Sequence, residues 1–162
     1  MIKGVDYFET YAPVVSWTTV RLVMTLAVNL GLKSKQVDYN NAFVQAELKP
    51  GEEVYMEFPR GHKQEGKVLK LTKSVYGLAN APLNWFKHLS EGLNECGLQP
   101  SSFDPCLFLS PKVLCVVYVD DCLFYARHEE DIDDIITQMK NLGYKLHAES
   151  DAARFLGVDL EK

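Results

Sequence analysis

The strongest constraint on the fold of this chain is a pair of adjacent aspartates, Asp120 and Asp121, set between two apolar runs. The runs cover residues 113–117 (VLCVV) and 122–126 (CLFYA). Apolar segments of this length, rich in Val, Phe and Tyr, are typical of strands, so the aspartates are expected at a tight connection between two strands. Burying two neighbouring carboxylates is costly, because each loses hydration and repels the other. The residues alone leave two environments open: a solvated hairpin tip, where Asp is a favoured residue, or a site for divalent cations.

A third carboxylate, Asp38, ends a predicted strand over residues 33–39. It precedes residues 40–44, which predict a turn or a short helix. Three converging carboxylates could hold two cations about 4 Å apart, which activates an attacking oxygen and stabilises a leaving pyrophosphate. Mg²⁺ suits such a site, because it prefers a few carboxylates together with substrate oxygens. The alternative, that Asp38 only caps the next turn, stays open on the residues alone.

Composition bounds the class of protein. The 162 residues, 47% of them hydrophobic and 24% charged, suit one domain or one lobe of a larger protein. The longest apolar run is interrupted by Thr25 and Asn29, and the N-terminus has no signal pattern, so we expect a soluble intracellular protein without a membrane partner. The 17 basic and 22 acidic residues, a net charge of −5, give no general attraction for nucleic-acid phosphates. Any nucleic-acid-binding surface must therefore be a local one, or must be supplied by parts of a larger protein that lie outside this sequence.

The spacing of cysteine and histidine argues against a zinc site. The four cysteines form no C-x-x-C pair, and the four histidines are scattered. We expect the cysteines to be reduced and buried as small hydrophobic residues. The acidic residues 129–131 open a predicted helix, which favours a solvated helix start over a metal site there.

Hydrophobic periodicity predicts an α+β fold with an antiparallel sheet rather than a doubly wound fold. Helices are predicted from the cap Ser16 to residue 30, from a first turn at Pro82 to Gly97, and over residues 129–142. Their inward faces are expected to carry Val20, Val23, Met24, Ala27 and Leu30; Phe86, Leu89, Leu93 and Cys96; and Ile132, Ile135, Ile136, Met139 and Leu142. Strands are predicted over residues 33–39, 53–58, 67–71, 103–109, 113–119, 122–126, 144–147 and 155–160.

Motifs along the whole chain resemble the reverse transcriptase of Ty1/copia-type LTR retrotransposons, an RNA-directed DNA polymerase. The blocks occur in the family's order at residues 4–15 (GVDYFETYAPVV), 36–43 (QVDYNNAF), 54–61 (VYMEFPRG), 73–78 (KSVYGL) with 81–82 (AP) and 85–86 (WF), 104–107 (DPCL), 118–121 (YVDD) and 155–158 (FLGV). Several blocks are weak individually, but together they are highly specific.

The resemblance implies a palm-type antiparallel sheet with packed helices, plus partial fingers, over residues 1–162. It makes Asp38, Asp120 and Asp121 the catalytic, metal-binding residues, with two Mg²⁺ or Mn²⁺ ions and the Tyr39 backbone carbonyl offered to one of them. The enzyme would extend a primer 3′-hydroxyl with deoxynucleoside triphosphates on an RNA or DNA template.

The resemblance further assigns Phe43, Tyr76 and Gly77, with Tyr39, to nucleotide binding and Tyr118 to the primer end. An aromatic residue at Phe43 would clash with a 2′-hydroxyl and favour deoxynucleotides. Each assignment has a structural alternative. Phe43 could be core packing, Gly77 a simple turn glycine rather than a point of close backbone approach, and Tyr118 a structural strand residue.

The chain also departs from the family pattern. Residues 79–83 (ANAPL) lose an expected basic contact to template or nucleotide. The basic fingers strand is expected upstream of Met1, and the thumb and RNase H domain after the last block, so we expect a fragment. The resemblance implies RNase H and integrase domains of the same polyprotein as partners. It implies a cytoplasmic location, with virus-like particles and nuclear access left open.

Two rival functions remain at this stage. One is a non-catalytic retrotransposon relic that keeps the fold and has at most a binding or assembly role. The other is a different two-metal enzyme, such as a nuclease or a nucleotide cyclase on a palm-like fold. A cyclase would carry a Gly-Gly-rich hairpin where residues 118–121 (YVDD) stand.

Overall fold

The computed structural model describes residues 9–48, 51–150, 154–155 and 158–159. They form two compact units. The hairpin unit contains residues up to 12 and residues 41–88, and the sheet unit contains residues 13–40 and those from 89 onward. The described residues include three α-helices and a six-stranded antiparallel sheet, which confirms the predicted α+β class. The assignment of palm and partial fingers to residues 1–162 stays a prediction.

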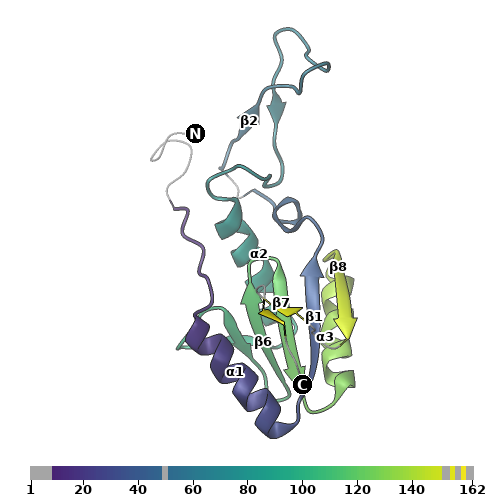
Figure 1. The fold of residues 1–162 in the computed structure, drawn as a ribbon. Helices are drawn as coiled ribbons and strands as arrows, with labels where there is room; N and C mark the ends of the chain where they lie inside the picture. The colour runs from purple at the N-terminus through teal and green to yellow at the C-terminus, as the bar shows by residue number, and fades with distance from the viewer. Residues whose placement is uncertain (1–8, 49–50, 151–153, 156–157, 160–162) are drawn as a thin grey trace. The chain divides into compact units, whose positions relative to one another are not determined.

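The sheet unit is built on strands in the order β4-β5-β6-β7-β1-β8, and every neighbouring pair is antiparallel. Figure 1 labels β6, β7, β1 and β8 of this sheet. The strands are β1 (Lys33–Tyr39), β4 (Gln99–Pro100), β5 (Leu107–Leu109), β6 (Val113–Tyr118), β7 (Asp121–Ala126) and β8 (Leu146–Ser150). The central strands match the predicted ones because long runs of Val, Cys, Phe and Tyr favour a pleated, buried surface. The short edge strand β4 was missed, and β8 begins later than the predicted residue 144, since Tyr144 is buried in the connection before it.

Helix α1 (Trp17–Leu30) has the predicted ends. The Ser16 side chain accepts a hydrogen bond from the Thr19 backbone N–H, and Gly31 closes the helix in the left-handed conformation. The expected inward position of Leu30 is wrong, because its side chain is 56% exposed. Thr19, which was not expected on the inward face, is buried, because its hydroxyl donates a hydrogen bond to a buried carboxylate.

That carboxylate belongs to Asp104, which is buried and anchors the start of α1. Its Oδ2 accepts hydrogen bonds from the Ser16 N–H at 3.0 Å and the Thr19 hydroxyl at 2.6 Å, and its Oδ1 accepts one from the Cys106 N–H at 2.9 Å. The predicted strand over 103–109 is therefore wrong in its first half. Asp104 turns the chain to reach α1, and only Leu107–Leu109 pair as a strand.

Helix α3 (Glu129–Asn141) lies against β1 and β7 (Figure 1). Lys35, buried on β1, makes ion pairs to Glu129 at 2.8 Å and to Asp133 at 2.6 Å. Burial lowers the pKa of Lys35, but the two carboxylates outweigh it and hold the pKa above its usual range. The acidic start of the helix is thus partly paired rather than simply solvated. Leu142, expected inward, is 46% exposed.

Helix α2 (Ala81–Glu95) begins with Pro82 in its first turn, as predicted. Its interior Gly92 leaves the space that the Tyr144 ring occupies, because a Cβ at this position would overlap that ring.

All four cysteines are free and buried, which confirms the prediction for them.

The remaining strands are shorter than predicted. In the hairpin unit, β2 (Tyr55–Met56) pairs with β3 (Leu69–Lys70), and η1 (Ala42–Gln45) is the short helix expected after Asp38. Both residues of β2, Tyr55 and Met56, are exposed. In the sheet unit, β9 (Arg154–Phe155) and β10 (Val158–Asp159) pair with each other. The prediction of a single strand over 155–160 is therefore wrong for the described residues of this range.

Within the described residues, no helix is long and apolar enough to cross a bilayer.

Replacing Asp104 with Asn should lower the free energy of unfolding at pH 7 by about 2 kcal/mol, because hydrogen bonds to a buried charged group lose strength. Burial raises the pKa of Asp104, but the hydrogen bonds from Thr19, Ser16 and Cys106 outweigh it and hold the pKa below 3.8. The contribution is therefore fully present above pH 3.8 and is lost as the pH falls through the lower, folded-state pKa.

Urea unfolding of the parent and Asp104→Asn across this pH range measures the difference, with the exposed Asp134→Asn as control. A difference that grows as the pH falls would contradict this account.

Candidate active site

Three strands bring predicted site residues into one row across the sheet. Asp38 on β1 lies directly opposite Asp121 on β7, and Asp121 lies directly opposite Tyr118 on β6. Side chains of directly opposed residues point to the same face of an antiparallel sheet. We call Asp38, Asp121 and Tyr118 the catalytic row, after the catalytic role that the sequence predicts for the two aspartates. The structure therefore brings together residues separated by about half of the chain.

Asp120 lies in the two-residue turn between β6 and β7, next to the row. The Tyr39 backbone N–H, which follows Asp38, donates a hydrogen bond to the Asp120 carbonyl at 3.0 Å. Its turn partner Val119 has a φ of 56°. A positive φ is rare for a β-branched residue and stores strain, which surrounding structure must hold in place. The β-ladders on both sides and the Tyr39 hydrogen bond provide that support.

The charges in the row act on one another. Burial raises the pKa of Asp38, and the negative charge of Asp120 raises it further. Burial also raises the pKa of Asp121. The Gln36 amide lowers it through a hydrogen bond of 3.4 Å, and the charges of Asp120 and Asp38 raise it again. Repulsion among these carboxylates is therefore a property of this fold, and a bound cation would relieve it.

Sequence reasoning missed two residues of the edge strand β8 that lie on the same face. His147 is directly opposite Asp38, and Glu149 is directly opposite Gln36. The charge of His147 lowers the pKa of Asp38, whereas that of Glu149 raises it. Neither residue is part of a recognisable motif, so only the register of β1 and β8 reveals them.

The side chains of Asp38, Asp120 and Asp121 are carboxylates, which are the donors that a hard divalent cation prefers. Among the described residues, however, no group of three or more His, Cys, Asp or Glu side chains is arranged to hold a metal ion as it stands. The metal roles of Asp38, Asp120 and Asp121 therefore stay predictions, supported by register and by mutual charge. Tyr39 is buried, its ring edge-on to Tyr144 at 5.9 Å between centroids, and the role of its carbonyl is likewise a prediction.

Of the predicted nucleotide-binding residues, Tyr39 lies in the sheet unit, whereas Phe43, Tyr76 and Gly77 lie in the hairpin unit. The Phe43 and Tyr76 rings pack together with centroids 4.7 Å apart. Phe43 is half-buried and Tyr76 is exposed, so this pair is a surface feature rather than core. Gly77 has a φ of 98° with open space where a Cβ would lie, which is what a turn glycine requires. Its close approach to a ligand stays a prediction.

A buried polar cluster in the hairpin unit was also missed by sequence reasoning. Asn84 donates hydrogen bonds to Ser74 at 3.2 Å and Glu52 at 3.4 Å, and Asn80 donates to Glu52 at 3.4 Å. Ser74, Asn80 and Asn84 are all buried. Asn80 lies in the block that departs from the family pattern, and its amide here joins the loop at Glu52 to the start of α2. Isolated polar residues in a sequence carry no signal for such a cluster.

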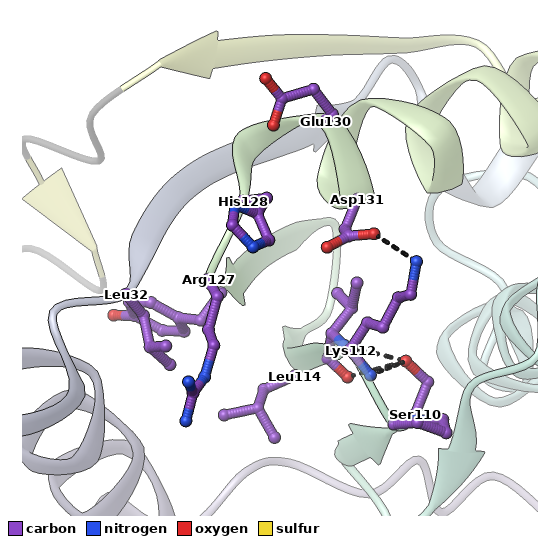
Figure 2. A pocket seen from close by; sticks show the side chains of 11 residues that line it. Leu32, Ser110, Lys112, Leu114, Arg127, His128, Glu130 and Asp131 are labelled. Carbon is purple, nitrogen blue, oxygen red and sulfur yellow. Dashed lines mark hydrogen bonds and ion pairs between the residues drawn. The ribbon is translucent and has the colours of Figure 1, made fainter.

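The pocket shown in Figure 2 lies away from the catalytic row. It has a volume of about 550 Å³ and includes Val113, Leu114, Tyr125 and Arg127 in its lining. Val113 and Ala126 form the pair at the opposite end of the β6–β7 ladder from Tyr118 and Asp121. Residues advance roughly 3.4 Å each along an antiparallel strand, so about 17 Å separates the two ends. This pocket is not part of the candidate active site.

The comparisons with known proteins agree on one family. A family model described as reverse transcriptase (RNA-dependent DNA polymerase) matches residues 1–162. The chain is 35% identical over 133 residues to the Retrovirus-related Pol polyprotein from transposon TNT 1-94 of Nicotiana tabacum, covering 77% of this chain and 10% of that protein. It is 31% identical over 166 residues to the polyprotein from transposon RE2 of Arabidopsis thaliana, covering 98% and 11%. With the Transposon Ty1-ER2 Gag-Pol polyprotein of Saccharomyces cerevisiae it shares 27% identity over 142 residues, covering 84% and 8%. The chain thus spans only a small part, 8–11%, of these relatives' length.

Replacing Val119 with Gly should relieve the strain of its positive φ, whereas Val119→Ala should keep it, because Ala retains a Cβ. We expect the Gly variant to be more stable than the Ala variant by about 1 kcal/mol. Urea unfolding followed by circular dichroism measures this difference. The order is the reverse of that at an ordinary strand position, where Gly is the less stable residue. An Ala variant more stable than the Gly variant would show that the turn is unstrained.

Proposed function

Because the chain belongs to the reverse transcriptase (RNA-dependent DNA polymerase) family, we propose that it is the catalytic palm of a copia-type RNA-directed DNA polymerase. In this proposal it adds deoxynucleotides to a primer 3′-hydroxyl by two-metal nucleotidyl transfer. The observation that carries the proposal is the catalytic row, in which Asp38 and Asp121 lie opposite each other with Asp120 in the adjoining turn. The packing of the core gives no reason to place carboxylates opposite each other, whereas two-metal nucleotidyl transfer requires such an arrangement.

Asp38, Asp120 and Asp121 would hold two Mg²⁺ or Mn²⁺ ions. When bound, such ions promote ionisation of an attacking hydroxyl and neutralise charge on a leaving pyrophosphate. The protein's own contribution is to orient the carboxylates. Gln36 holds one oxygen of Asp121 through its amide, and the Tyr39 N–H holds the turn that carries Asp120. The first contact limits rotation of the Asp121 side chain, and the second fixes the backbone from which the Asp120 side chain projects.

The proposed partners follow from this chemistry. The substrates are an RNA or DNA template with its primer and deoxynucleoside triphosphates, with Phe43, Tyr76 and Gly77 contacting the nucleotide and Tyr118 the primer. The relatives are Pol and Gag-Pol polyproteins, so we propose RNase H and integrase domains as further partners. In the same proposal, the polymerase acts in the cytoplasm, within virus-like particles.

The parent chain should bind Mn²⁺ in competition with Mg²⁺, and the double variant Asp120→Asn/Asp121→Asn should bind it at least about ten-fold more weakly, because two of three charged ligands are gone. Electron paramagnetic resonance of free Mn²⁺ measures both. The matched control, Glu130→Gln/Asp134→Asn, removes the same charge from exposed positions of α3. Equal binding by the parent chain and both variants would refute the metal site.

Primer extension on an RNA template tests the activity itself. Extension by the parent chain should fall by roughly a hundred-fold or more in Asp120→Asn/Asp121→Asn, because the groups that stabilise the transition state are lost. The control Glu130→Gln/Asp134→Asn should extend the primer like the parent. If the parent chain binds Mn²⁺ yet extends no primer, the alternative of a non-catalytic relic holds.

A further inference from the structure

A small pocket lies in the sheet unit where the chain enters α1. It has a volume of about 380 Å³ and is lined by Val14, Val15, Trp17 and Tyr118. Val15 is buried, whereas the Val14 and Trp17 side chains are 57% and 52% exposed. The lining contains two aromatic rings, two aliphatic side chains and no charged group. Such a surface suits a flat, weakly polar ligand rather than a phosphate.

The pocket adjoins the catalytic row, because Tyr118 belongs to both. Tyr118 is directly opposite Asp121, which is directly opposite Asp38. Neighbouring strands are about 4.8 Å apart, so the backbone at Tyr118 lies roughly 5 Å from that of Asp121 and roughly 10 Å from that of Asp38. A nucleoside seated against Tyr118 is therefore within reach of the carboxylates.

The ends of the row suit different parts of a polymerase substrate. We assign the incoming nucleotide to the β1 end, because Tyr39, which is predicted to bind it, follows Asp38 on this strand. The β6 end then remains for the strand that receives the nucleotide. Its last sugar must place a 3′-hydroxyl beside the carboxylates, while its base needs an apolar surface on which to stack. Trp17, next to Tyr118, offers an indole for this purpose.

We propose that Val14, Trp17 and Tyr118 form the binding pocket for the terminal nucleoside of the primer, with Trp17 stacking on its base. This inference rests on the proposed function and extends it to residues outside the carboxylate motifs. Val14 also lines the pocket, and a bound primer would cover the Val14 and Trp17 side chains that are exposed in the free chain.

Tryptophan fluorescence provides a direct test. The chain has two tryptophans, and Trp85 is only 1% exposed. Adding a template–primer with a recessed 3′ end to the full chain should quench the emission of Trp17, because a stacked base is an efficient quencher. The response should disappear in Trp17→Phe, which keeps the stacking surface and removes the signal. Single-stranded template alone should give little response.

Affinity provides a second readout. Trp17→Ala should weaken binding of a fluorescein-labelled template–primer, measured by anisotropy, roughly ten-fold, since base–aromatic stacking is lost. Trp17→Phe should retain most of the affinity. Leu22→Ala, which removes another exposed apolar side chain of α1 outside the pocket, should bind like the parent. The KM for the deoxynucleotide should change far less than the Kd of the primer.

The outcomes separate the two proposals. If the parent chain binds template–primer while Trp17→Ala binds it equally well and Trp17 emission stays constant, the pocket assignment is wrong and the proposed function stands. If template alone quenches Trp17 as strongly, the primer assignment is wrong. Quenching that depends on protein concentration without nucleic acid would identify a second copy as the occupant and overturn the assignment. No binding of any template–primer would overturn the proposed function and this inference with it.

Discussion

The antiparallel pairing of β6, β7 and β1 is the interaction on which the rest of the structure depends. Its register places Asp38, Asp121 and Tyr118 on one face and sets Val37 against Cys122 on the other, both fully buried. A slip of one residue on any of these strands would reverse its faces, burying a carboxylate and exposing the core. The same pairing that forms the core thus positions the candidate active site, and neither can change without the other.

Several features of the candidate active site are unfavourable for folding, and contacts elsewhere in the sheet unit offset them. Carboxylates face one another, burial raises their pKa values, and Val119 is held at a positive φ. Two other buried charged residues of the sheet unit, Asp104 and Lys35, bind partners on distant elements. Asp104 ties α1 to the strand β5 region, and Lys35 ties α3 to β1. The strain at Val119 itself is tolerated because the ladders of β6, β7 and β1 and the Tyr39 hydrogen bond hold the turn in place.

Sequence reasoning succeeded where local pattern and burial agree. Strand β1, helix α1 with its Ser16 cap, and the hairpin around Asp120 follow from periodicity and turn chemistry. It failed where a distant partner decides the outcome. Residues 103–106 resemble a strand, but the Asp104 carboxylate binds Ser16 and Thr19, far away in the sequence. Leu30 and Leu142 fit the helical period, yet both lie at helix ends where the core no longer covers them.

By itself, the sequence determined the α+β class, the hairpin that carries Asp120 and Asp121, the buried reduced cysteines and the order of the family's motifs. Those features are local, since each depends on neighbouring residues and their alternation along one strand or helix. Only the tertiary structure decided that Asp38 faces Asp121, that His147 and Glu149 lie beside them, and that Val14 and Trp17 share a pocket with Tyr118. The reason is physical. Strand register and helix docking are set by the burial of whole faces, and no local pattern records which distant residues those faces bring together.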